Sequence, residues 1–232
     1  MKKKTLILSS VLLFSLFCTR ATAQVEHVYS ITATDEKTVI EAFDAWFSTE
    51  DSDYGQTAAL ISVVANGSEP STHYLVLNYP DYASCQAAIE GVEKSGEFAK
   101  MQLRTSEIST SDGESVYLHV TNNGKSGKAG DYLYVVGVDV SGKDSVYIAA
   151  FNELMNSAIG KKAPGEFKLV ATRAGGDSDY LVILSAPSFE ALNKYLDSYT
   201  DDDEDWQNFL SKAEGISVAT SSSFLRTIKI WE

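Results

Sequence analysis

Hydrophobic and polar residues follow one another in a pattern that occurs twice along this 232-residue chain. Residues 74–77 and 180–183 are matching apolar runs of strand length. After each run, apolar residues are spaced i, i+3, i+7 and i+10, as on one face of an amphipathic helix. These residues are Tyr82, Cys85, Ile89 and Val92 in the first half, and Phe189, Leu192, Leu196 and Tyr199 in the second. Because order, spacing and chemistry agree, we interpret the chain as two copies of one unit.

Each half is predicted to contain a strand, a helix, two strands, a helix and a strand, the βαββαβ order of a ferredoxin-like unit. In the first half we expect strands at residues 28–33, 58–65, 73–78 and 115–120. In the second half we expect strands at residues 132–140, 166–173, 180–184 and 224–231. Val39, Phe43 and Trp46 form the apolar face of the first helix. Its counterpart is expected at residues 145–158, with Gly160 as the C-cap.

Several of the predicted strands are apolar on both faces, among them residues 58–64 and 180–184. Such runs are typical of sheets that are covered on both sides. The helices of each half can cover one face, and the sheet of the other half is the obvious cover for the second. We therefore expect an α+β protein in which two tandem ferredoxin-like repeats pack sheet to sheet. The repeats are assigned to residues 24–120 and 131–232, with a linker at residues 121–130.

This arrangement resembles the dimeric α/β-barrel superfamily, which includes the antibiotic-biosynthesis-monooxygenase-like proteins. Those proteins usually pair two ferredoxin-like subunits sheet to sheet, whereas here both units are fused in one chain. The resemblance covers residues 28–231 and concerns architecture, because no motif of a particular enzyme subfamily is present. It implies an intramolecular barrel that is a monomeric pseudo-dimer. Because the superfamily includes haem-degrading and cofactor-free oxygenases, the resemblance also implies that such activities are candidates for this chain.

The first 23 residues have the pattern of a secretory signal peptide. Three lysines at positions 2–4 precede an apolar stretch at residues 6–17 that is short for a membrane span. Residues 21–23, Ala-Thr-Ala, match the pattern that signal peptidase accepts, so cleavage is predicted before Gln24. Cys18 would suggest a lipoprotein, but the bulky Phe17 precedes it. We expect an exported, soluble protein, either periplasmic or secreted, with no membrane span in the mature chain.

Removal of this leader makes the protein more acidic. The whole chain has 19 Lys and Arg residues against 32 Asp and Glu residues, and the leader contains four of the basic ones. The mature chain therefore carries a net charge of −17. Such a surface repels phosphate backbones and anionic lipid, so neither nucleic acid nor a membrane is expected as a partner.

Cys85 is the one cysteine that remains after removal of the leader, so no intramolecular disulfide can form. We interpret Cys85 as a buried hydrophobic residue.

The candidate site residues are polar or aromatic residues of the first half. Three candidate catalytic residues are His73, Asn78 and His119, because a histidine can act as a general base or as a haem ligand. Three candidate ligand-binding residues, of the kind that orients an aromatic molecule, are Tyr117, Tyr79 and Trp46. Structural interpretations stay open beside these: strand-edge histidines, a turn cap at Asn78 and a core position for Trp46.

Other motifs bring little chemistry. The acidic run at residues 201–205 suggests calcium, but it lacks the spacing of an EF-hand loop and can instead stabilise the N-terminus of a helix. Residues 124–126, Gly-Lys-Ser, resemble the end of a P-loop whose first glycine is missing. Nucleophile-elbow, zincin and C-x-x-C motifs are not found, and no metal site is predicted.

Two functions of different class stay open at this point. The first is a small-ligand-binding module, favoured because no catalytic constellation is present, with a small apolar or aromatic molecule as its partner. The second is a cofactor-independent monooxygenase or isomerase acting on an aromatic compound, or a haem-handling protein. The second follows from the superfamily resemblance together with His73, Asn78 and His119. Except for haem in that last case, no cofactor is expected.

Overall fold

The computed structural model describes residues 24–232, so the leader predicted for residues 1–23 lies outside the described residues. The first half consists of β1 (Val25–Ala33), α1 (Glu36–Phe47), the short 3-10 helix η1 (Glu50–Ser52), β2 (Thr57–Ala65), β3 (His73–Tyr79), α2 (Tyr82–Val92), α3 (Gly96–Thr105) and β4 (Ser109–Asn122). The second half consists of β5 (Tyr132–Val140), α4 (Asp144–Asn156), α5 (Ala158–Lys161), β6 (Phe167–Ala174), β7 (Tyr180–Ala186), α6 (Phe189–Leu196), α7 (Glu204–Ala213) and β8 (Ser217–Trp231). Within these residues, no helix is long and apolar enough to cross a membrane.

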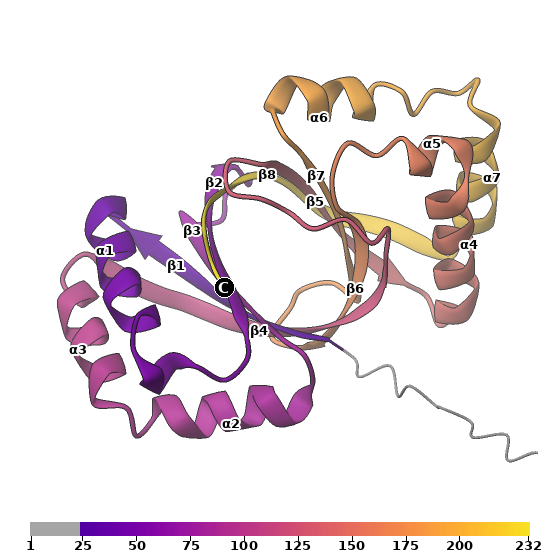
Figure 1. The fold of residues 1–232 in the computed structure, drawn as a ribbon. Coiled ribbons are helices and arrows are strands. Elements are labelled where there is room, and N and C mark those ends of the chain that lie inside the picture. Colours follow the sequence, from indigo (N-terminus) through magenta and orange to yellow (C-terminus); the bar gives the residue numbers. More distant parts are fainter. Residues whose placement is uncertain (1–23) are drawn as a thin grey trace, which may run out of the picture.

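The eight strands form one closed antiparallel barrel in the order β1-β3-β2-β8-β5-β7-β6-β4. Figure 1 looks along this barrel and shows the helices of the two halves outside it, on opposite sides. The predicted fold class, two tandem ferredoxin-like repeats forming an intramolecular α/β barrel, is confirmed. The two sheets face each other and also hydrogen-bond along their edges, through the β2–β8 and β4–β6 pairs.

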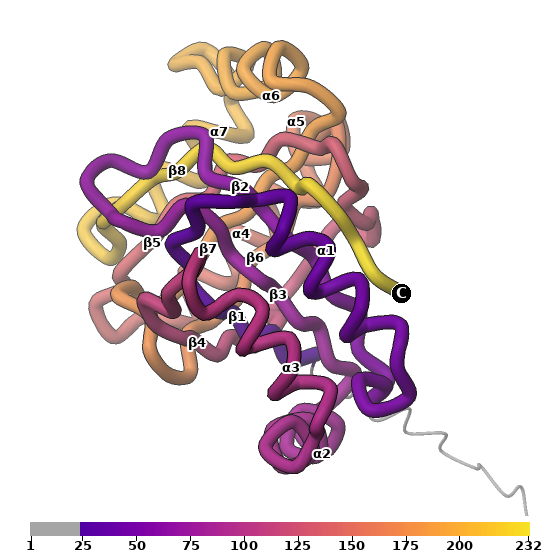
Figure 2. The backbone as a smooth tube through the Cα atoms, turned by 90° about the vertical axis from the view of Figure 1, so that its left-hand side faces the viewer, coloured from indigo at the N-terminus to yellow at the C-terminus, as the bar shows by residue number. Residues whose placement is uncertain are grey.

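The last strand joins the second half to the first. β8 lies between β5 and β2, and its C-terminal end runs beside α1 (Figure 2). There the indole Nε1 of Trp231 donates to Asp44 Oδ1 at 2.8 Å, and the Trp231 ring packs against Phe47 with ring centroids 4.9 Å apart. The core of the first half therefore includes a side chain from the far end of the sequence.

β4 and β8 are longer than the strands predicted at residues 115–120 and 224–231. Their additional N-terminal residues are mostly exposed and rich in serine and threonine, so the sequence shows no hydrophobic alternation there. These residues are nevertheless held in the sheet by β1 and β5, whose partners reach back to Ser109 and Ser217. Pairing with a neighbouring strand supplies the order that local sequence does not indicate.

Gly160 does not have the predicted role of a C-cap. α4 ends at Asn156, and Gly160 lies inside the following short helix α5. A Cβ atom at this position would collide with the backbone carbonyl of Leu154. The glycine is therefore required by the close approach of α5 to the end of α4 and not by helix termination.

The apolar residues form three clusters because strand side chains alternate between the two faces of the barrel wall. Two clusters lie between the wall and the helices, one in each half, and we call them the helix layers. The third fills the inside of the barrel and contains the buried residues Ile61, Tyr117, Leu133, Val170, Ile183 and Leu225. Any polar side chain on this inner face must therefore be accommodated among hydrophobic residues.

Candidate functional site

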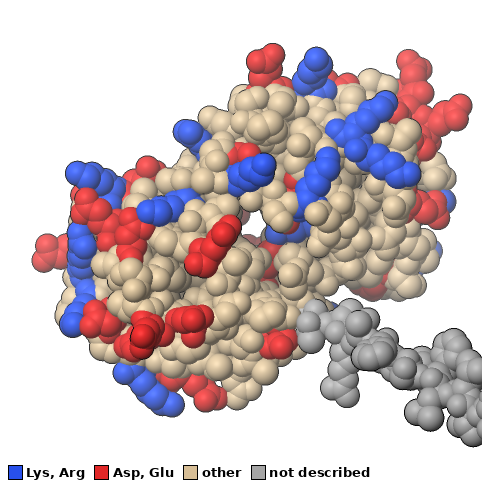
Figure 3. All heavy atoms as spheres, viewed as in Figure 1, with Lys and Arg blue, Asp and Glu red and all other residues tan. Residues whose placement is uncertain are grey.

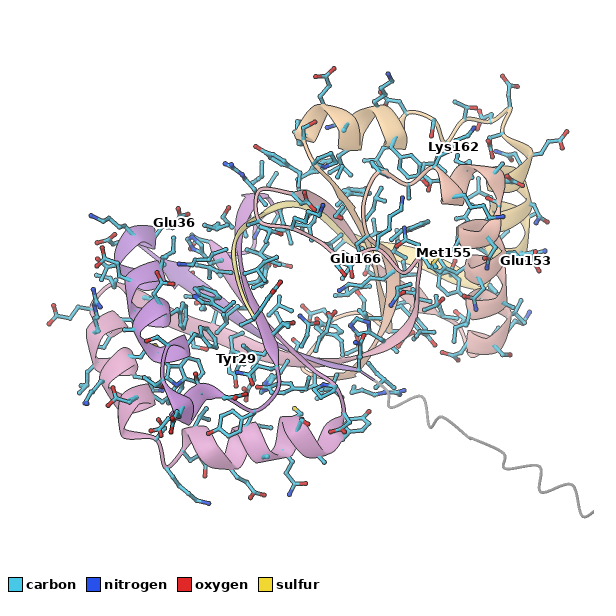
Figure 4. All side chains as sticks on the ribbon, in the orientation of Figure 1. Tyr29, Glu36, Glu153, Met155, Lys162 and Glu166 are labelled. Atoms are coloured by element: carbon cyan, nitrogen blue, oxygen red, sulfur yellow. The ribbon has the colours of Figure 1, made fainter. Side chains whose placement is uncertain are left out.

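Four ionisable side chains meet inside one mouth of the barrel, and we call them the mouth cluster: Glu26, His119, Glu166 and Lys168. Strand alternation places them there, because Val25 and Leu118 on the adjacent positions face a helix layer. Lys168 likewise lies between Phe167 and Leu169, which face the other helix layer. Figure 4 shows Glu166 at the inner side of the ring.

This mouth is the one where the described chain begins and ends, and it faces the viewer in Figures 1 and 3. The space-filling view shows a hollow at the centre of this face, with basic and acidic side chains around it (Figure 3). The mouth cluster therefore lies at the end of the barrel that is hollowed toward solvent.

Glu26 is the centre of the cluster. Its Oε1 accepts a hydrogen bond from His119 Nε2 at 2.6 Å and another from Lys168 Nζ at 2.5 Å. Both Glu26 and Lys168 are buried, with exposed fractions of 3% and 7%. Burial alone would raise the pKa of Glu26, but the Lys168 charge and the His119 hydrogen bond outweigh it and lower this pKa from 4.5 to about 2. Glu26 is therefore a carboxylate at neutral pH.

Lys168 and Glu166 complete the charge balance. Burial alone would lower the pKa of Lys168, but the carboxylates of Glu26 and Glu166 raise it above its usual value. The Lys168 Nζ atom lies 3.5 Å from Glu166 Oε1, a full ångström farther than from Glu26. Burial raises the pKa of Glu166, because Lys168 compensates this carboxylate only in part.

His119 has one ring nitrogen without a partner. Its Nε2 donates to the Glu26 carboxylate, so in the neutral imidazole Nδ1 carries the lone pair and is an acceptor. This Nδ1 atom is buried and has no hydrogen-bond partner. A buried nitrogen with unused bonding capacity, held in place by a carboxylate, is uncommon in a barrel otherwise filled with apolar side chains.

Three of the predicted site residues face the interior of the barrel. His119 belongs to the cluster, and both Asn78 and Tyr117 lie directly opposite Glu26, in the β1–β3 and β1–β4 registers. Asn78 faces the barrel interior because its neighbours Leu77 and Tyr79 face the first helix layer. Catalytic and ligand-binding candidates thus share one inner surface.

The other three predicted residues lie on the opposite face of the wall. The Nε2 atom of His73 pairs with Glu36 Oε2 at 3.1 Å, and its Nδ1 lies 2.8 Å from Thr72 Oγ1. Tyr79 and Trp46 are buried in the first helix layer. His73 and His119 therefore do not share a site, and the six candidates divide into two groups of three.

Glu26, Glu166 and Lys168 were not among the predicted site residues. One signal was available: Glu166 and Lys168 are charged residues at alternate positions of a predicted strand, next to the apolar Phe167 and Leu169. Such residues usually face water, so their pattern alone would indicate an exposed edge. Glu26 lay two residues before the predicted start of the first strand, whereas β1 begins at Val25.

A haem group does not fit the described histidines. An axial ligand needs a ring nitrogen that is free and faces open space. The chain has three histidines, and their Nε2 atoms lie 2.6–3.1 Å from the carboxylates of Glu26, Glu36 and Glu114. The Nδ1 atom of His119 has no partner, but it is buried and does not face a space that could hold a haem plane. The helix layers are filled by rings in contact, such as Trp46 against Phe98 with ring centroids 5.1 Å apart.

Addition of haemin to the purified protein is expected to leave the Soret band of free haemin unchanged, because no histidine offers a free Nε2 atom. A spectrophotometric titration with apomyoglobin as the positive control checks this. A saturable red shift that is complete at one equivalent of haemin would contradict it.

The acidic run at residues 201–205 starts a helix, as one of the two sequence interpretations held. Asp203 is the N-cap of α7, and its side chain accepts a hydrogen bond from Trp206 N at 2.8 Å. Glu204 and Asp205 occupy the first turn, where negative charge is favourable. Among the residues that the structure describes, no group of three or more His, Cys, Asp or Glu side chains is arranged to hold a metal ion.

Replacement of Asp203 by alanine is expected to cost about 1 kcal/mol of unfolding free energy, because the N-cap hydrogen bond of α7 is lost. Urea denaturation measures it. The exposed Asp201 is the matched control, and Asp201→Ala is expected to change stability by less than about 0.5 kcal/mol. Equal losses of unfolding free energy in Asp203→Ala and Asp201→Ala would show that the acidic run at residues 201–205 acts by charge alone.

A ring of eight antiparallel strands, built from two ferredoxin-like halves with helices outside, is the dimeric α/β-barrel fold with both units in one chain. Solved structures share it. A "putative monooxygenase" from Fusobacterium nucleatum subsp. nucleatum matches with a TM-score of 0.63 at 10% identity, over 90% of this chain and 94% of its own. An anthrone oxidase-like protein matches with a TM-score of 0.57 at 12% identity, over 92% and 94%.

A variant of chlorite dismutase from Candidatus Nitrospira defluvii matches with a TM-score of 0.52 at 10% identity, over 89% of this chain and 92% of its own. At these identities the likeness shows the fold alone. No model of a protein family and no curated protein matches the sequence. The similarly folded structures are monooxygenase-like, oxidase-like and chlorite dismutase proteins by name, so the fold by itself leaves the role of this chain open.

Proposed function

We propose that the protein binds a small molecule at the hollowed mouth of the barrel. The mouth cluster holds the polar part of the ligand, and apolar residues of the interior contact the rest. The observation that carries this proposal is the buried Nδ1 atom of His119, which has no partner although it lies beside the ionised Glu26 and Lys168.

Stability alone does not account for the mouth cluster. Burial of charged groups costs several kcal/mol per ion, and apolar residues in place of a buried ion pair are often neutral or stabilising. The inner wall elsewhere is built from residues such as Leu133, Val170 and Leu225. A polar ligand would supply the bonds that the cluster leaves unused.

The fold and the candidate residues support the same function. Asn78 adds an amide opposite Glu26, so polar side chains of β1, β3, β4 and β6 lie close together at the mouth. The Tyr117 ring lies on the same inner face, but its hydroxyl lies beside Gly176, beyond the far end of β6. Binding sites commonly combine an apolar lining with a few converging polar groups. Similarly folded proteins carry the names monooxygenase and anthrone oxidase-like protein, which are activities on small molecules.

Methyl-labelled protein titrated with a mixture of neutral, cationic and anionic small aromatic and aliphatic compounds tests the proposal. Binding at the mouth is expected to shift the NMR signals of Leu133, Val170 and Ile183, which line the interior. Leu154 and Leu192 are the matched controls, because they are equally buried but lie in the second helix layer. Shifts confined to the control methyls, or no shift with any compound, would overturn it.

A second candidate function is proton transfer by a cofactor-independent isomerase or monooxygenase. The observation that favours it is the Glu26–His119 pair, in which the carboxylate fixes the imidazole tautomer and leaves Nδ1 as a base. Lys168, fixed beside the same carboxylate, would stabilise an oxyanion formed when a carbon acid loses its proton.

Exchange of the benzylic protons of phenylacetone in D₂O tests this second candidate. A catalytic His119 is expected to accelerate the exchange, and His119→Gln would reduce the acceleration by about 100-fold or more. Glu153→Gln, which changes an exposed ion pair on α4, is the control and should leave the rate unchanged. If the exchange rate with the wild-type protein equals the rate in buffer alone, proton transfer is overturned and the ligand-binding proposal is unaffected.

We further propose that the mature chain is exported and acts as a monomer. The leader pattern of residues 1–23 supports export, and the closed ring supports the monomer because both sheets already find their partners within one chain. Expression of the full chain in a bacterium, followed by fractionation, N-terminal sequencing and light scattering, tests both. A cytoplasmic protein that retains its leader, or a mass of twice the chain, would contradict them.

A further inference from the structure

We infer that the ligand head group at the barrel mouth is a primary amine, bound as its ammonium ion between Glu166 and His119, an inference that rests on the function proposed above. The donors and acceptors of the mouth cluster, its charge balance and the apolar wall behind it lead to this head group.

The bonding capacity left unused in the cluster belongs to acceptors. Glu26 receives both strong hydrogen bonds, from His119 and from Lys168, on its Oε1 atom. His119 has its remaining nitrogen, Nδ1, buried without a partner. Glu166 is a carboxylate whose cation, Lys168, lies at 3.5 Å and is engaged more closely by Glu26. A ligand that completes these groups must donate hydrogen bonds.

The charges of the cluster select a cation among such donors. Two carboxylates face one lysine, so Glu26, Glu166 and Lys168 together carry one uncompensated negative charge when both glutamates are ionised. The raised pKa of Glu166 agrees with this geometry, since burial of this carboxylate is not fully offset by Lys168. An anionic ligand would add a third negative charge to a buried site, whereas an ammonium ion neutralises the one in excess.

The geometry also favours a compact cation over a guanidinium. An ammonium group has three donors that can turn to suit acceptors from different directions, whereas a guanidinium is planar and suits a carboxylate that it can meet with two parallel bonds. Here the free acceptors are a carboxylate and a single ring nitrogen on different strands. Glu166 and His119 flank the same Lys168–Glu26 ion pair, with Glu166 Oε1 3.5 Å from Lys168 Nζ and His119 Nε2 2.6 Å from Glu26 Oε1.

The rest of the ligand is apolar. Ile183 lies opposite Lys168 in the β6–β7 register, and Val170 lies opposite His119 in the β4–β6 register. Both face the interior and are buried. The wall behind the charged cluster is therefore aliphatic, which fits an alkylamine or an arylalkylamine.

Titration of the protein with n-hexylamine, n-hexanol and hexanoate at pH 7, followed by the methyl signals of Val170 and Ile183, tests the inference. Hexylamine is expected to bind at least about tenfold more tightly than hexanol, because its charge adds to the same apolar contact. Hexanoate is expected not to bind at the mouth. The preference for hexylamine is expected to fall by about tenfold in Glu166→Gln and to persist in Glu153→Gln.

The outcomes separate the two proposals. If hexanol or hexanoate shifts the Val170 and Ile183 signals as strongly as hexylamine does, the amine inference is overturned while ligand binding at the mouth stands. If none of the three compounds, nor the broader mixture, shifts these signals, both are overturned. Because the comparison among the three compounds uses the unaltered protein, it holds even if Glu166→Gln fails to fold.

Discussion

Replacement of Lys168 by methionine is expected to destabilise the protein by about 3–5 kcal/mol, the range for breaking a buried ion pair by removal of one partner. The change removes the only lysine or arginine that pairs with Glu26 among the described residues and leaves two carboxylates, Glu26 and Glu166, inside the barrel mouth. Methionine keeps the length of the side chain, so the loss reflects charge more than packing. Urea denaturation with a two-state fit gives the difference.

A matched control shows that burial sets this magnitude. Lys100 pairs with Glu97 at 2.6 Å, a separation close to that of Lys168 and Glu26, but its side chain is 72% exposed. Lys100→Met is expected to cost less than about 1 kcal/mol. Glu26→Gln added to Lys168→Met is expected to restore part of the loss, because it removes one of the two uncompensated charges. If both single variants lose the same stability, the ion pair at the mouth is no more important than a surface pair.

Acidification from pH 6 to pH 2 is expected to remove about 3 kcal/mol of stability through Glu26 alone, since one pKa unit corresponds to about 1.4 kcal/mol. The pKa of Glu26 is lowered from 4.5 to about 2 in the folded protein. A lowered folded pKa means that the unfolded chain binds the proton first. The contribution of Glu26 is therefore complete above about pH 5 and is lost as the pH falls toward 2.

The measurement compares unfolding free energies of the wild type and Glu26→Gln at pH 6, 4 and 3. The wild type should lose more stability than the variant over this range, and the two should converge near pH 2. Glu166 acts in the opposite direction, because its raised pKa gives a contribution that is present in acid and lost as the pH rises. The Glu26 carboxylate contributes to that raised pKa, so the difference between the two proteins measures Glu26 together with its effect on Glu166. Parallel pH profiles would contradict the assignment.

Much of the fold could be predicted from the sequence because the signals that carry it are local. Amphipathic spacing located the helices, apolar runs located the buried parts of the strands, and the correspondence between residues 74–77 and 180–183 revealed the duplication. The start of α7 at Asp203 was likewise readable from an acid followed by helical spacing. The exposed beginnings of β4 and β8 were not, since only their partner strands hold them.

The mouth cluster could not be predicted in the same way, because its members meet only through long-range pairing. Glu26 belongs to the first strand and Lys168 to the sixth, 142 residues apart in sequence. They come together because β4 lies between β1 and β6, an edge contact between the two halves that no local pattern encodes. Of the polar residues on the inner face, His119, Asn78 and Tyr117 were found because their chemistry is unusual for a strand, whereas lysine and glutamate resemble ordinary surface residues.

The position of β8 has a consequence for how the chain is made. Trp231, the penultimate residue, packs in the helix layer of the first half and donates to Asp44 of α1, and β8 is the strand that covers the edge of β2. During synthesis, the N-terminal half emerges from the ribosome before β8 has been made. Until then, the β2 edge is open to other extended chains. Completion of the first half therefore waits until β8 has been synthesised and pairs with β2.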